Sequence, residues 1–544
     1  MDDSNEKTQL LDEEDGSETE IFTAEHSNKE GGSSTHSRAP IAYSYEEAIS
    51  RTGYGRFHYT LLVLCGWALS SDAIEVLSIS FILPPVTCDL NLSTSDKGWL
   101  TAIIFAGMMV GSFLWGTLAD QYGRRAILLW SLMVNGLGAL SSSFAQNFPL
   151  FLALRFVSGI GVGGSLPVVF SYFTEFQPKY KRGSMISLLA TFWMSGNIIA
   201  AALAWAIIPH NLGIKTPTFT YTSWRIFLAV CAFPSISSAV FFACMPESPK
   251  FLITNGKTDK ALLVLRKMFI RNNPGKKYSD FEVTDVQSEG RIDIDRSDSF
   301  YTSTSTCSRW CYNIKESCTV FTRNTAMLFK PPLTRISVVL TIIFFTLSFG
   351  YYGLFLWFPE LFSRMEKYGG SPCSVPNTMA NVTEVSNSTQ CDGTVNNNIY
   401  FEGFLTAVAN LPGNILTILI IDRINRNVLL AASMVISGIS VFFIVLVQNK
   451  VQSIVMSCIF SGISVIGWNA LDVIGMELFP TNLRSTANGV EMSVGRIAAI
   501  LGNIVFGQLV DVYCAVPLIL IAALLSFGGL IALKLPSRAD TDLM

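Results

Sequence analysis

Residues 116–125 read GTLADQYGRR and connect two apolar blocks of about twenty residues each. Glycine permits a tight turn and a close approach of backbones, because it carries no side chain. The carboxylate and the two arginines of the stretch can make charge-assisted contacts with neighbouring helix ends. Such a latch can favour one of two arrangements of the helices. We therefore interpret five residues as a gating motif: Gly116, Asp120, Gly123, Arg124 and Arg125.

The chain repeats this unit at a fixed spacing. Asp422, followed by Arg423, stands at the position of Asp120 with an offset of 422 − 120 = 302 residues. A second pattern, E-x-x-P-x-x-x-R, occurs twice with the same offset, 477 − 175 = 302. Two motifs with one offset indicate a duplicated six-helix unit. The charged ends of the second pattern are further gating candidates: Glu175 and Arg182, then Glu477 and Arg484.

Hydropathy supports twelve membrane spans. Half of the residues are hydrophobic (50%), only 15% are charged, and the apolar residues gather into blocks long enough to cross a bilayer. A spanning segment must satisfy its own backbone hydrogen bonds, so each block is expected to be a helix. We expect an all-α membrane protein with twelve transmembrane helices in two six-helix halves. The blocks are 57–84, 98–119, 126–145, 150–172, 184–209, 224–244, 334–358, 400–421, 428–448, 451–476, 486–511 and 513–535.

Charge bias sets the expected orientation. Lys and Arg gather in the loops on one side, and this excess marks the cytoplasmic side, so we expect both termini there. The acidic N-terminal stretch has no apolar core, so the first span is expected to act as the insertion signal. The expected organisation is a disordered acidic cytoplasmic tail (1–50), an N-terminal half (51–250), a cytoplasmic central loop (251–333), a C-terminal half (334–537) and a short tail (538–544).

A polar loop over 364–399 is expected on the opposite, lumenal side. It contains two acceptor sequences for N-glycosylation, at Asn381 and Asn387, and a third acceptor, Asn91, lies in the first loop of the same side. The loop also holds Cys373 and Cys391, which can pair in an oxidising compartment. These features agree with the orientation that the charge bias indicates.

Further motifs resemble the major facilitator superfamily. The stretch 116–125 is similar to its G-x-L-x-D-x-x-G-R-R signature, and Arg155 begins a stretch that resembles its R-x-x-x-G-x-G motif. Residues 246–250 (PESPK) resemble a signature of its sugar and organic-ion porters. This resemblance implies the major facilitator fold, in which Arg155 joins the gating candidates.

Longer stretches resemble one branch, the synaptic vesicle glycoprotein 2 family. They are spread over residues 45–537 and comprise 71–76, 168–173, 203–209, 351–353 and 468–473. The family's long lumenal domain of pentapeptide repeats is replaced here by the short loop 364–399. Family roles placed on that domain, notably binding of clostridial neurotoxins, therefore do not carry over. The resemblance implies a central small-ligand site at four matching positions: Trp193, Tyr352, Trp468 and Asp472.

The first span carries two carboxylates, Asp72 and Glu75, near its middle. Ionisable residues inside a membrane are costly, so each is a functional hypothesis. At a spacing of three they share a helix face, and mutual repulsion favours protonation of one of them. The pair suits a proton-binding or cation-binding role, and the alternative is a structural hydrogen-bonded pair.

Aromatic and polar residues are expected to line a cavity between the halves. Aromatic faces with carboxylates would hold an organic cation through cation–π attraction and charge, whereas each aromatic taken alone also fits ordinary helix packing. Arg496 can compensate one of the buried carboxylates across the cavity. The candidates besides Asp72 and Glu75 are Trp193, Asn197, Tyr351, Tyr352, Trp468, Asp472, Glu491 and Arg496.

Two functions stay open. One is a secondary active transporter that moves a small organic solute, cationic or sugar-like, by alternating access with proton coupling through Asp72 or Glu75. The other is a vesicle protein that regulates exocytosis through protein interactions with little or no transport. The sequence has no nucleotide-binding loop, hydrolase or metalloprotease motif and no basic stripe, so we expect no enzyme activity, cofactor or nucleic-acid partner. We also expect a monomer without a bound metal.

A sorting signal is expected in the N-terminal tail. Glu6, Leu10 and Leu11 fit the acidic dileucine pattern that clathrin adaptors read. The pattern predicts a multi-pass protein of synaptic or other secretory vesicles or of endolysosomal membranes, which cycles through the plasma membrane.

Overall fold

The computed structural model describes residues 42–536, except for 211, 218, 287–318, 320, 369–395, 422, 448 and 481–482. Its described part contains twelve helical segments long and apolar enough to cross a membrane, which confirms the predicted number. The helix bounds differ from the predicted blocks by at most five residues, and the helices Arg56–Asp89 and Thr94–Tyr122 extend beyond them at both ends.

The first half consists of six spanning helices. Local signals set their ends: Ser93 and Asp96 form a capping box that starts the second helix, and Asn147 caps the fourth. Gly123 has a φ of 102° and forms the sharp turn between the second and third helices, which residues with a Cβ rarely adopt. The helices are α3 (Arg56–Asp89), α4 (Thr94–Tyr122), α5 (Arg124–Ser143), α6 (Phe148–Thr174), α7 (Lys179–Ile207) and α8 (Ser223–Ala243).

The second half repeats the arrangement with one interruption. Its eighth span consists of two helices separated at Ala409, because Pro412 has no N–H to donate to the carbonyl one turn earlier. The segments are α12 (Thr334–Phe355), α14 (Asn397–Val408) with α15 (Asn410–Ile420), α16 (Arg426–Leu446), α17 (Lys450–Leu478), α18 (Arg484–Leu509) and α19 (Ala515–Ala532).

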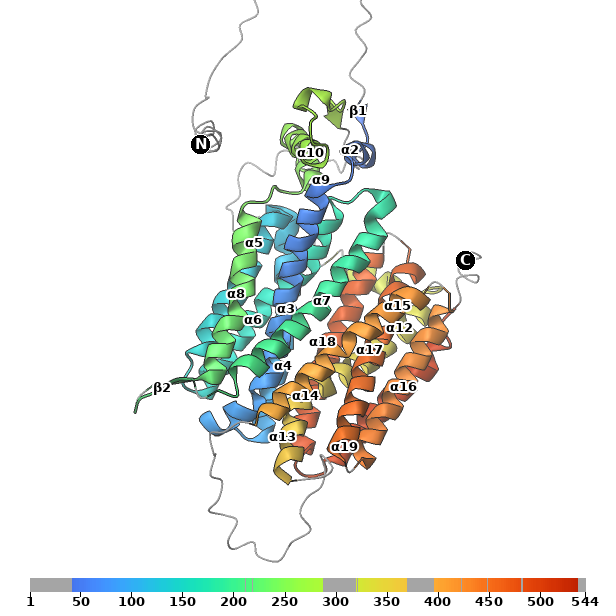
Figure 1. The fold of residues 1–544 in the computed structure, drawn as a ribbon. Coiled ribbons are helices and arrows are strands. Elements are labelled where there is room, and N and C mark those ends of the chain that lie inside the picture. The colour runs from blue at the N-terminus through green and yellow to red at the C-terminus, as the bar shows by residue number, and fades with distance from the viewer. Residues whose placement is uncertain are drawn as a thin grey trace, which may run out of the picture. The chain divides into compact units, whose positions relative to one another are not determined.

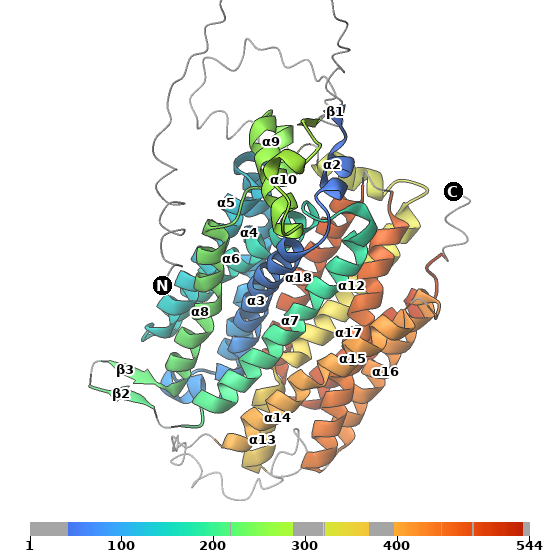
Figure 2. The same cartoon turned by 45° about the horizontal axis from the view of Figure 1, so that its top comes forward.

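The two halves lie side by side along helices that are far apart in sequence (Figure 1). Helix α4 packs against α18, and α7 packs against α14, so each of these pairs joins one half to the other. The view in Figure 2 shows the same neighbours, with α7 next to α14 and α15. A site that uses residues of both halves is therefore expected at the interface between them.

Short elements form a small domain, here named the α10 cap, on one end of the first half. It comprises β1 (Ala42–Tyr43), α2 (Tyr45–Arg51), α9 (Pro249–Thr254), α10 (Thr258–Asn272), a 3₁₀ turn (Tyr278–Asp280) and β4 (Asp285–Val286). Strand β1 pairs in parallel with β4. The end of the bundle that carries this cap is called the α10 face below.

The α10 cap corrects two predicted boundaries. The segment expected to be disordered, 1–50, includes α2, whose N-cap Ser44 accepts a hydrogen bond from the backbone of Glu47. The central loop expected over 251–333 includes α10, whose apolar face packs into the cap. Both elements are too short and too polar to show in hydropathy, yet their apolar faces are buried.

The opposite end of the bundle is called the α13 face. It carries α13 (Phe358–Tyr368) and a hairpin of β2 (Gly213–Lys215) and β3 (Thr220–Thr222). The loop predicted to begin at 364 is therefore helical up to Tyr368, because α13 buries Leu361, Phe362 and Met365.

Candidate functional site

An aromatic cluster joins the two halves near the middle of the bundle. The ring centroids of Tyr352 and Trp468 lie 5.9 Å apart, and those of Tyr351 and Trp468 lie 6.1 Å apart. Tyr352 also meets Phe105 of α4 at 4.9 Å, which brings in the first half. Phe105 was missed by sequence reasoning, because it is one apolar residue among many in its span.

A cation from the second half reaches the first half at the same level. Arg496 on α18 donates a hydrogen bond to the sulfur of Met108 on α4 over 3.0 Å. Its guanidinium is also within electrostatic range of the carboxylate of Asp72 and of Tyr352. The predicted compensation of a buried carboxylate by Arg496 stays a prediction, for which Asp72 is the carboxylate within range.

Asp72 and Glu75 have different direct partners within one hydrogen-bond network, because Ser158 donates both to Glu75 and to the side chain of Asn135. The side chain of Asp72 is fully buried and accepts hydrogen bonds from Ser165 over 2.7 Å and Asn135 over 3.3 Å. Glu75 forms an ion pair with Arg155 of α6 and accepts a hydrogen bond from Ser158. The two carboxylates are therefore linked through Asn135 and Ser158, and Arg155 is the ion-pair partner of Glu75.

Several polar atoms near the aromatic cluster have no hydrogen-bond partner in the described part of the chain. They include Trp468 Nε1, Glu491 Oε1 and Ser348 Oγ, all buried. Buried polar groups are normally satisfied, so unsatisfied ones next to aromatic faces indicate a place for a polar ligand or ordered water. The residue Asp472 keeps accessible surface, although its carboxylate is surrounded by protein atoms and lies within electrostatic range of Glu491 and Tyr352.

Two of the predicted site residues lie apart from this cluster. Trp193 packs against the apolar core shared by the halves, and Asn197 is buried on the same helix. Neither makes a ring contact or hydrogen bond with the cluster within residues that the structure describes. The candidate site therefore comprises the residues that the structure brings together: Asp72, Tyr351, Tyr352, Trp468, Asp472, Glu491 and Arg496, with Phe105 and Met108 added.

Charged residues close the interface at the α13 face. Lys97 of the first half donates to Glu360 of α13 over 2.7 Å, and both side chains are buried. Arg364 pairs with Glu360 at 3.2 Å and with Asp511 at 2.7 Å. The sequence does not show these contacts, since the partners of Lys97 and Asp511 are distant in sequence.

The carboxylate of Asp511 is tied to both halves. Partial burial acts to raise its pKa, but hydrogen bonds from Thr94 and Arg364 and nearby cations prevail and hold that pKa below its usual value. The contacts of ionised Asp511 are therefore complete near neutral pH and are lost as pH falls through this lowered pKa.

Close packing reinforces this closure. Gly98 of α4 and Gly507 of α18 meet so closely that a Cβ at Gly507 would lie 2.7 Å from Gly98 Cα. Nearby, a cavity of about 10 Å3 between α3, α12, α13 and α14 is lined by Phe81 and Phe358 among others. That volume is close to the least that one water molecule needs, so no solute fits there. At these contacts the two halves are closely packed on the α13 face.

The gating motif at the α10 face makes its contacts inside the first half. Arg124 pairs with Asp120 at 2.6 Å and with Glu175 at 3.5 Å. Arg125 donates to the carbonyls at the end of α8, and its backbone N–H donates to Glu247. Gly116 was expected to allow close packing, but a Cβ there would meet nothing within 4 Å, so this reading of Gly116 is wrong.

The other gating candidates show the same pattern. Arg182 pairs with Glu46 of the α10 cap at 2.8 Å. In the second half Glu477 pairs with Arg426, and Arg484 donates to the carbonyl of Phe479. Arg423 is exposed, and Asp422 lies outside the described residues. Within the described ranges, every ion pair at the α10 face thus stays within one half, whereas the α13 face has a pair across the halves.

Some predicted residues cannot be placed. The glycosylation candidates Asn381 and Asn387, the cysteines Cys373 and Cys391, and the sorting residues Glu6, Leu10 and Leu11 lie outside the described residues. Asn91 is described and is exposed at the α13 face.

Two cysteines that sequence reasoning passed over are disulfide-bonded: Cys88 at the end of α3 and Cys514 before α19. The predicted pairing of Cys373 with Cys391 lies outside the described residues and stays a prediction. Peptide mapping without reduction should find Cys88 and Cys514 in linked peptides that reduction separates. Ready alkylation of either thiol before reduction would contradict this expectation, with the free thiol of Cys244 as the positive control.

The two-half helical bundle with a polar site at the interface defines a transporter-type membrane protein. Residues 61–502 match the Major Facilitator Superfamily. A partially occluded inward-open structure of the xylose transporter XylE from E. coli superposes with a TM-score of 0.63 at 16% identity, covering 89% of this chain and 99% of that one. A crystal structure of a D-xylose-proton symporter gives a TM-score of 0.59 at 16% identity, covering 89% and 99%.

Relatives of higher sequence identity show the family within this superfamily. The chain is 35% identical to synaptic vesicle glycoprotein 2C of Mus musculus, over 93% of this chain and 82% of that protein. It is 34% identical to synaptic vesicle glycoprotein 2B of the same species, over 93% and 87%. The chain therefore belongs to the synaptic vesicle glycoprotein 2 family of the major facilitator superfamily. The alignment with glycoprotein 2C has 605 positions, more than the 544 residues of this chain, so that relative carries inserted residues.

Proposed function

We propose that this protein is a secondary active transporter of a small organic solute, which it moves by alternating access. The supporting observation is the cluster of Tyr352, Trp468, Asp72 and Arg496, which draws on both halves inside an apolar bundle. Polar and charged groups at membrane depth are costly, and a solute or ion pathway is their usual use. A site shared by both halves changes its access when the halves rock about it.

The chemistry of the site favours a solute with a positive charge or several hydroxyls. Aromatic faces beside the carboxylate of Asp472 suit an organic cation. The unsatisfied Trp468 Nε1 and Glu491 Oε1 suit hydroxyl groups, and the superposed XylE is named as a xylose transporter. Asp72 is the proposed proton site, because Arg155 already neutralises Glu75.

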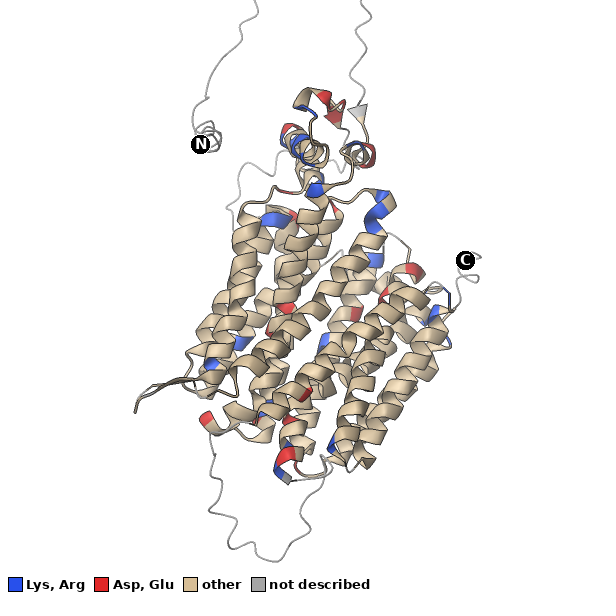
Figure 3. Cartoon of the chain, in the orientation of Figure 1, with Lys and Arg blue, Asp and Glu red and all other residues tan. Residues whose placement is uncertain are grey.

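The proposed orientation places the α10 face in the cytoplasm. Figure 3 shows Lys and Arg at the helix ends and in the cap on that face. Cytoplasmic loops of membrane proteins carry such an excess. The relatives are named as synaptic vesicle glycoproteins, so we propose a vesicle membrane with the α13 face toward the lumen. With the halves closely packed on the α13 face, we propose that the bundle is then closed to the lumen.

Uptake into proteoliposomes tests the proposal. Wild-type protein should accumulate an organic cation or a sugar from a broad panel, more strongly with a pH gradient. Asp72→Asn should abolish the effect of the gradient, because the amide cannot take up the proton. Asp472→Asn should lower uptake about ten-fold or more, because charge stabilisation of the solute is lost.

Asp259→Asn, on the exposed surface of the α10 cap, serves as the matched control and should transport like wild type. If no solute of the panel moves, and ligands bind equally to all variants, the transport proposal fails. The protein would then be a vesicle protein that acts through protein interactions.

A further inference from the structure

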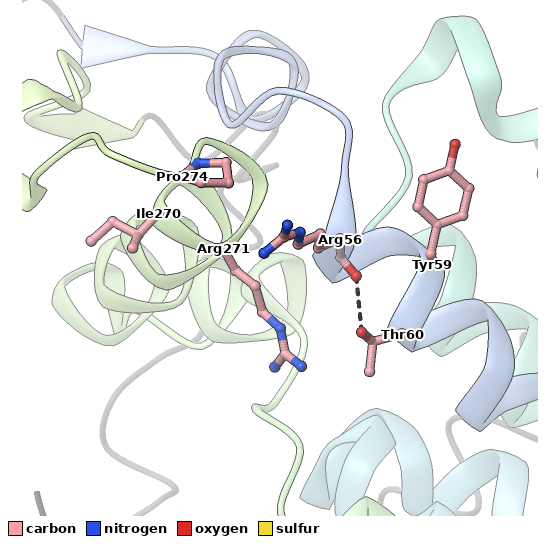
Figure 4. Close-up of a pocket in the computed structure, with 6 residues that line it drawn as sticks. All are labelled: Arg56, Tyr59, Thr60, Ile270, Arg271 and Pro274. Atoms are coloured by element: carbon pink, nitrogen blue, oxygen red, sulfur yellow. Dashed lines mark hydrogen bonds between the residues drawn. The ribbon is translucent and has the colours of Figure 1, made fainter. Parts of the chain in front are cut away.

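A pocket of about 580 Å3 lies where the start of α3 meets the end of α10 (Figure 4). It is at the α10 face, away from the polar site between the halves. None of its lining residues is acidic, and two are arginines. The lining comprises Arg56, Tyr59, Thr60, Ile270, Arg271 and Pro274.

The two arginines of this pocket have no anionic partner. Within the described chain, the guanidinium groups of Arg56 and Arg271 make no hydrogen bond or ion pair. The hydroxyl of Thr60 donates a hydrogen bond to the backbone carbonyl of Arg56, not to its side chain. By contrast, Arg51 in the same cap pairs with both Glu47 and Glu282. The fold thus brings two cations to one pocket and leaves their charge uncompensated.

The positions of these arginines are fixed by a neighbouring side chain. Asn272, directly after Arg271, accepts from the backbone N–H of Phe57 over 3.0 Å and donates to the carbonyl of Gly53 over 2.9 Å. These bonds join the end of α10 to the first turn of α3. The arginine backbones are therefore held in place before any ligand arrives, which lowers the entropy cost of binding.

The pocket lies at the boundary of the membrane. Arg56, Tyr59 and Val63 follow one face of α3, since they are three and four residues apart. Val63 is 58% exposed and, within a membrane span, faces lipid tails, whereas Tyr59 one turn before it is 55% exposed. Tyrosine is typical of the headgroup level, so Arg56 lies at the level of lipid phosphates.

We propose that this pocket binds the phosphate of an anionic phospholipid headgroup from the leaflet on the α10 face. Guanidinium groups donate paired hydrogen bonds to phosphate oxygens, and the positive end of the α3 helix dipole adds to the attraction. Anionic lipids concentrate in the cytoplasmic leaflet, where the α10 face is placed above. Bound lipid would hold the α10 cap against the membrane.

Lipid retention tests the proposal on the full chain. Protein in neutral detergent is mixed with phosphatidylcholine alone or with phosphatidylcholine and phosphatidylserine, and bound lipid is counted by native mass spectrometry. The double variant Arg56→Gln/Arg271→Gln should retain phosphatidylserine about ten-fold less than wild type, whereas Arg56→Lys/Arg271→Lys should retain part of it. The matched control Lys257→Gln/Lys260→Gln removes two exposed charges of the same cap outside the pocket and should bind as wild type does.

Three results would overturn the proposal. Equal loss of phosphatidylserine from the pocket and control variants would show a diffuse charge effect. Equal retention in all variants would show that the pocket is not the site. In the third result, inorganic phosphate protects wild type but not the pocket variant from thermal unfolding, and phosphatidylserine does not compete with it. This result would assign the pocket to a free anion. The arginines are exposed, so unfolding of the glutamine variant is not expected, and its elution on size exclusion checks this.

Discussion

Replacing Arg155 with methionine should destabilise the protein strongly, by about 3–5 kcal/mol. Arg155 and Glu75 form an ion pair in which the side chains are 0% and 1% exposed. Removing the cation leaves a buried carboxylate whose remaining partner is the hydroxyl of Ser158. The expected result is a large drop in the midpoint of thermal unfolding in detergent at a fixed scan rate.

A second variant separates the charge effect from lost packing. Arg155→Met/Glu75→Gln removes both charges and should recover most of the stability, because no unpaired ion remains. Arg182→Met breaks the partly exposed pair with Glu46 and should cost less than about 1 kcal/mol. A double variant no more stable than Arg155→Met would show that the pair itself does not explain the loss.

Solute uptake by the Arg155→Met variant decides whether the pair of Arg155 and Glu75 has a structural role or a role in transport. If the pair is structural, the folded fraction of Arg155→Met should still transport solute in the uptake assay. The two roles stayed open because Asp72 and Glu75 share a face when α3 is taken as a single helix. Contacts from α5 and α6 give them different direct partners, because Asn135 donates to Asp72 and Arg155 pairs with Glu75.

The sequence was sufficient for the spans, because apolar blocks of bilayer length must form helices. One of its two largest boundary errors in the first half is at α3, which was predicted to end at 84 and continues to Asp89 through Pro84 and Pro85. Two prolines suggest a helix end, but here the backbone hydrogen bonds that they remove lie near the last turns of the helix. Boundaries at such positions are set by packing, which a single sequence does not display.

The α10 cap could have been predicted in part. Ala261, Leu265, Met268 and Phe269 are buried and recur at helical spacing along α10. That helical periodicity is visible in the sequence, although the polar residues between these positions make the segment resemble a loop. The contacts of the cap could not be predicted, since Asn272 bonds to residues about two hundred positions earlier.

The site residues were predicted by type rather than by geometry. Arg496 stands out because charged side chains are costly inside a membrane, and Tyr352 and Trp468 because they match positions of the resembled family. Phe105 and Lys97 did not stand out, because one is an ordinary apolar residue and the other lies at a helix end. Their roles follow from contacts with Tyr352 and Glu360 in the other half.

Leucine at Gly98 or at Gly507 should force open the α13 face. A Cβ at Gly98 would lie 2.9 Å from the carbonyl oxygen of Asn503, and one at Gly507 would lie 2.7 Å from Gly98 Cα. Both neighbours are backbone atoms, which cannot swing aside as a side chain can. The two halves must therefore separate on this face, and overpacking of this kind costs about 1–3 kcal/mol.

The opening can be followed at Ser80, whose side chain is buried beside the cavity of about 10 Å3 under this face. In a Ser80→Cys background with Cys244→Ser and Cys458→Ser, a membrane-impermeant maleimide added from the α13 side should label the introduced thiol slowly. Gly98→Leu or Gly507→Leu should speed this labelling about ten-fold or more, since about 1.4 kcal/mol shifts a two-state equilibrium ten-fold. Gly183→Leu is the matched control, because a Cβ at Gly183 meets nothing within 4 Å. Unchanged labelling in both interface variants would mean that the contact of α4 with α18 does not hold the face closed.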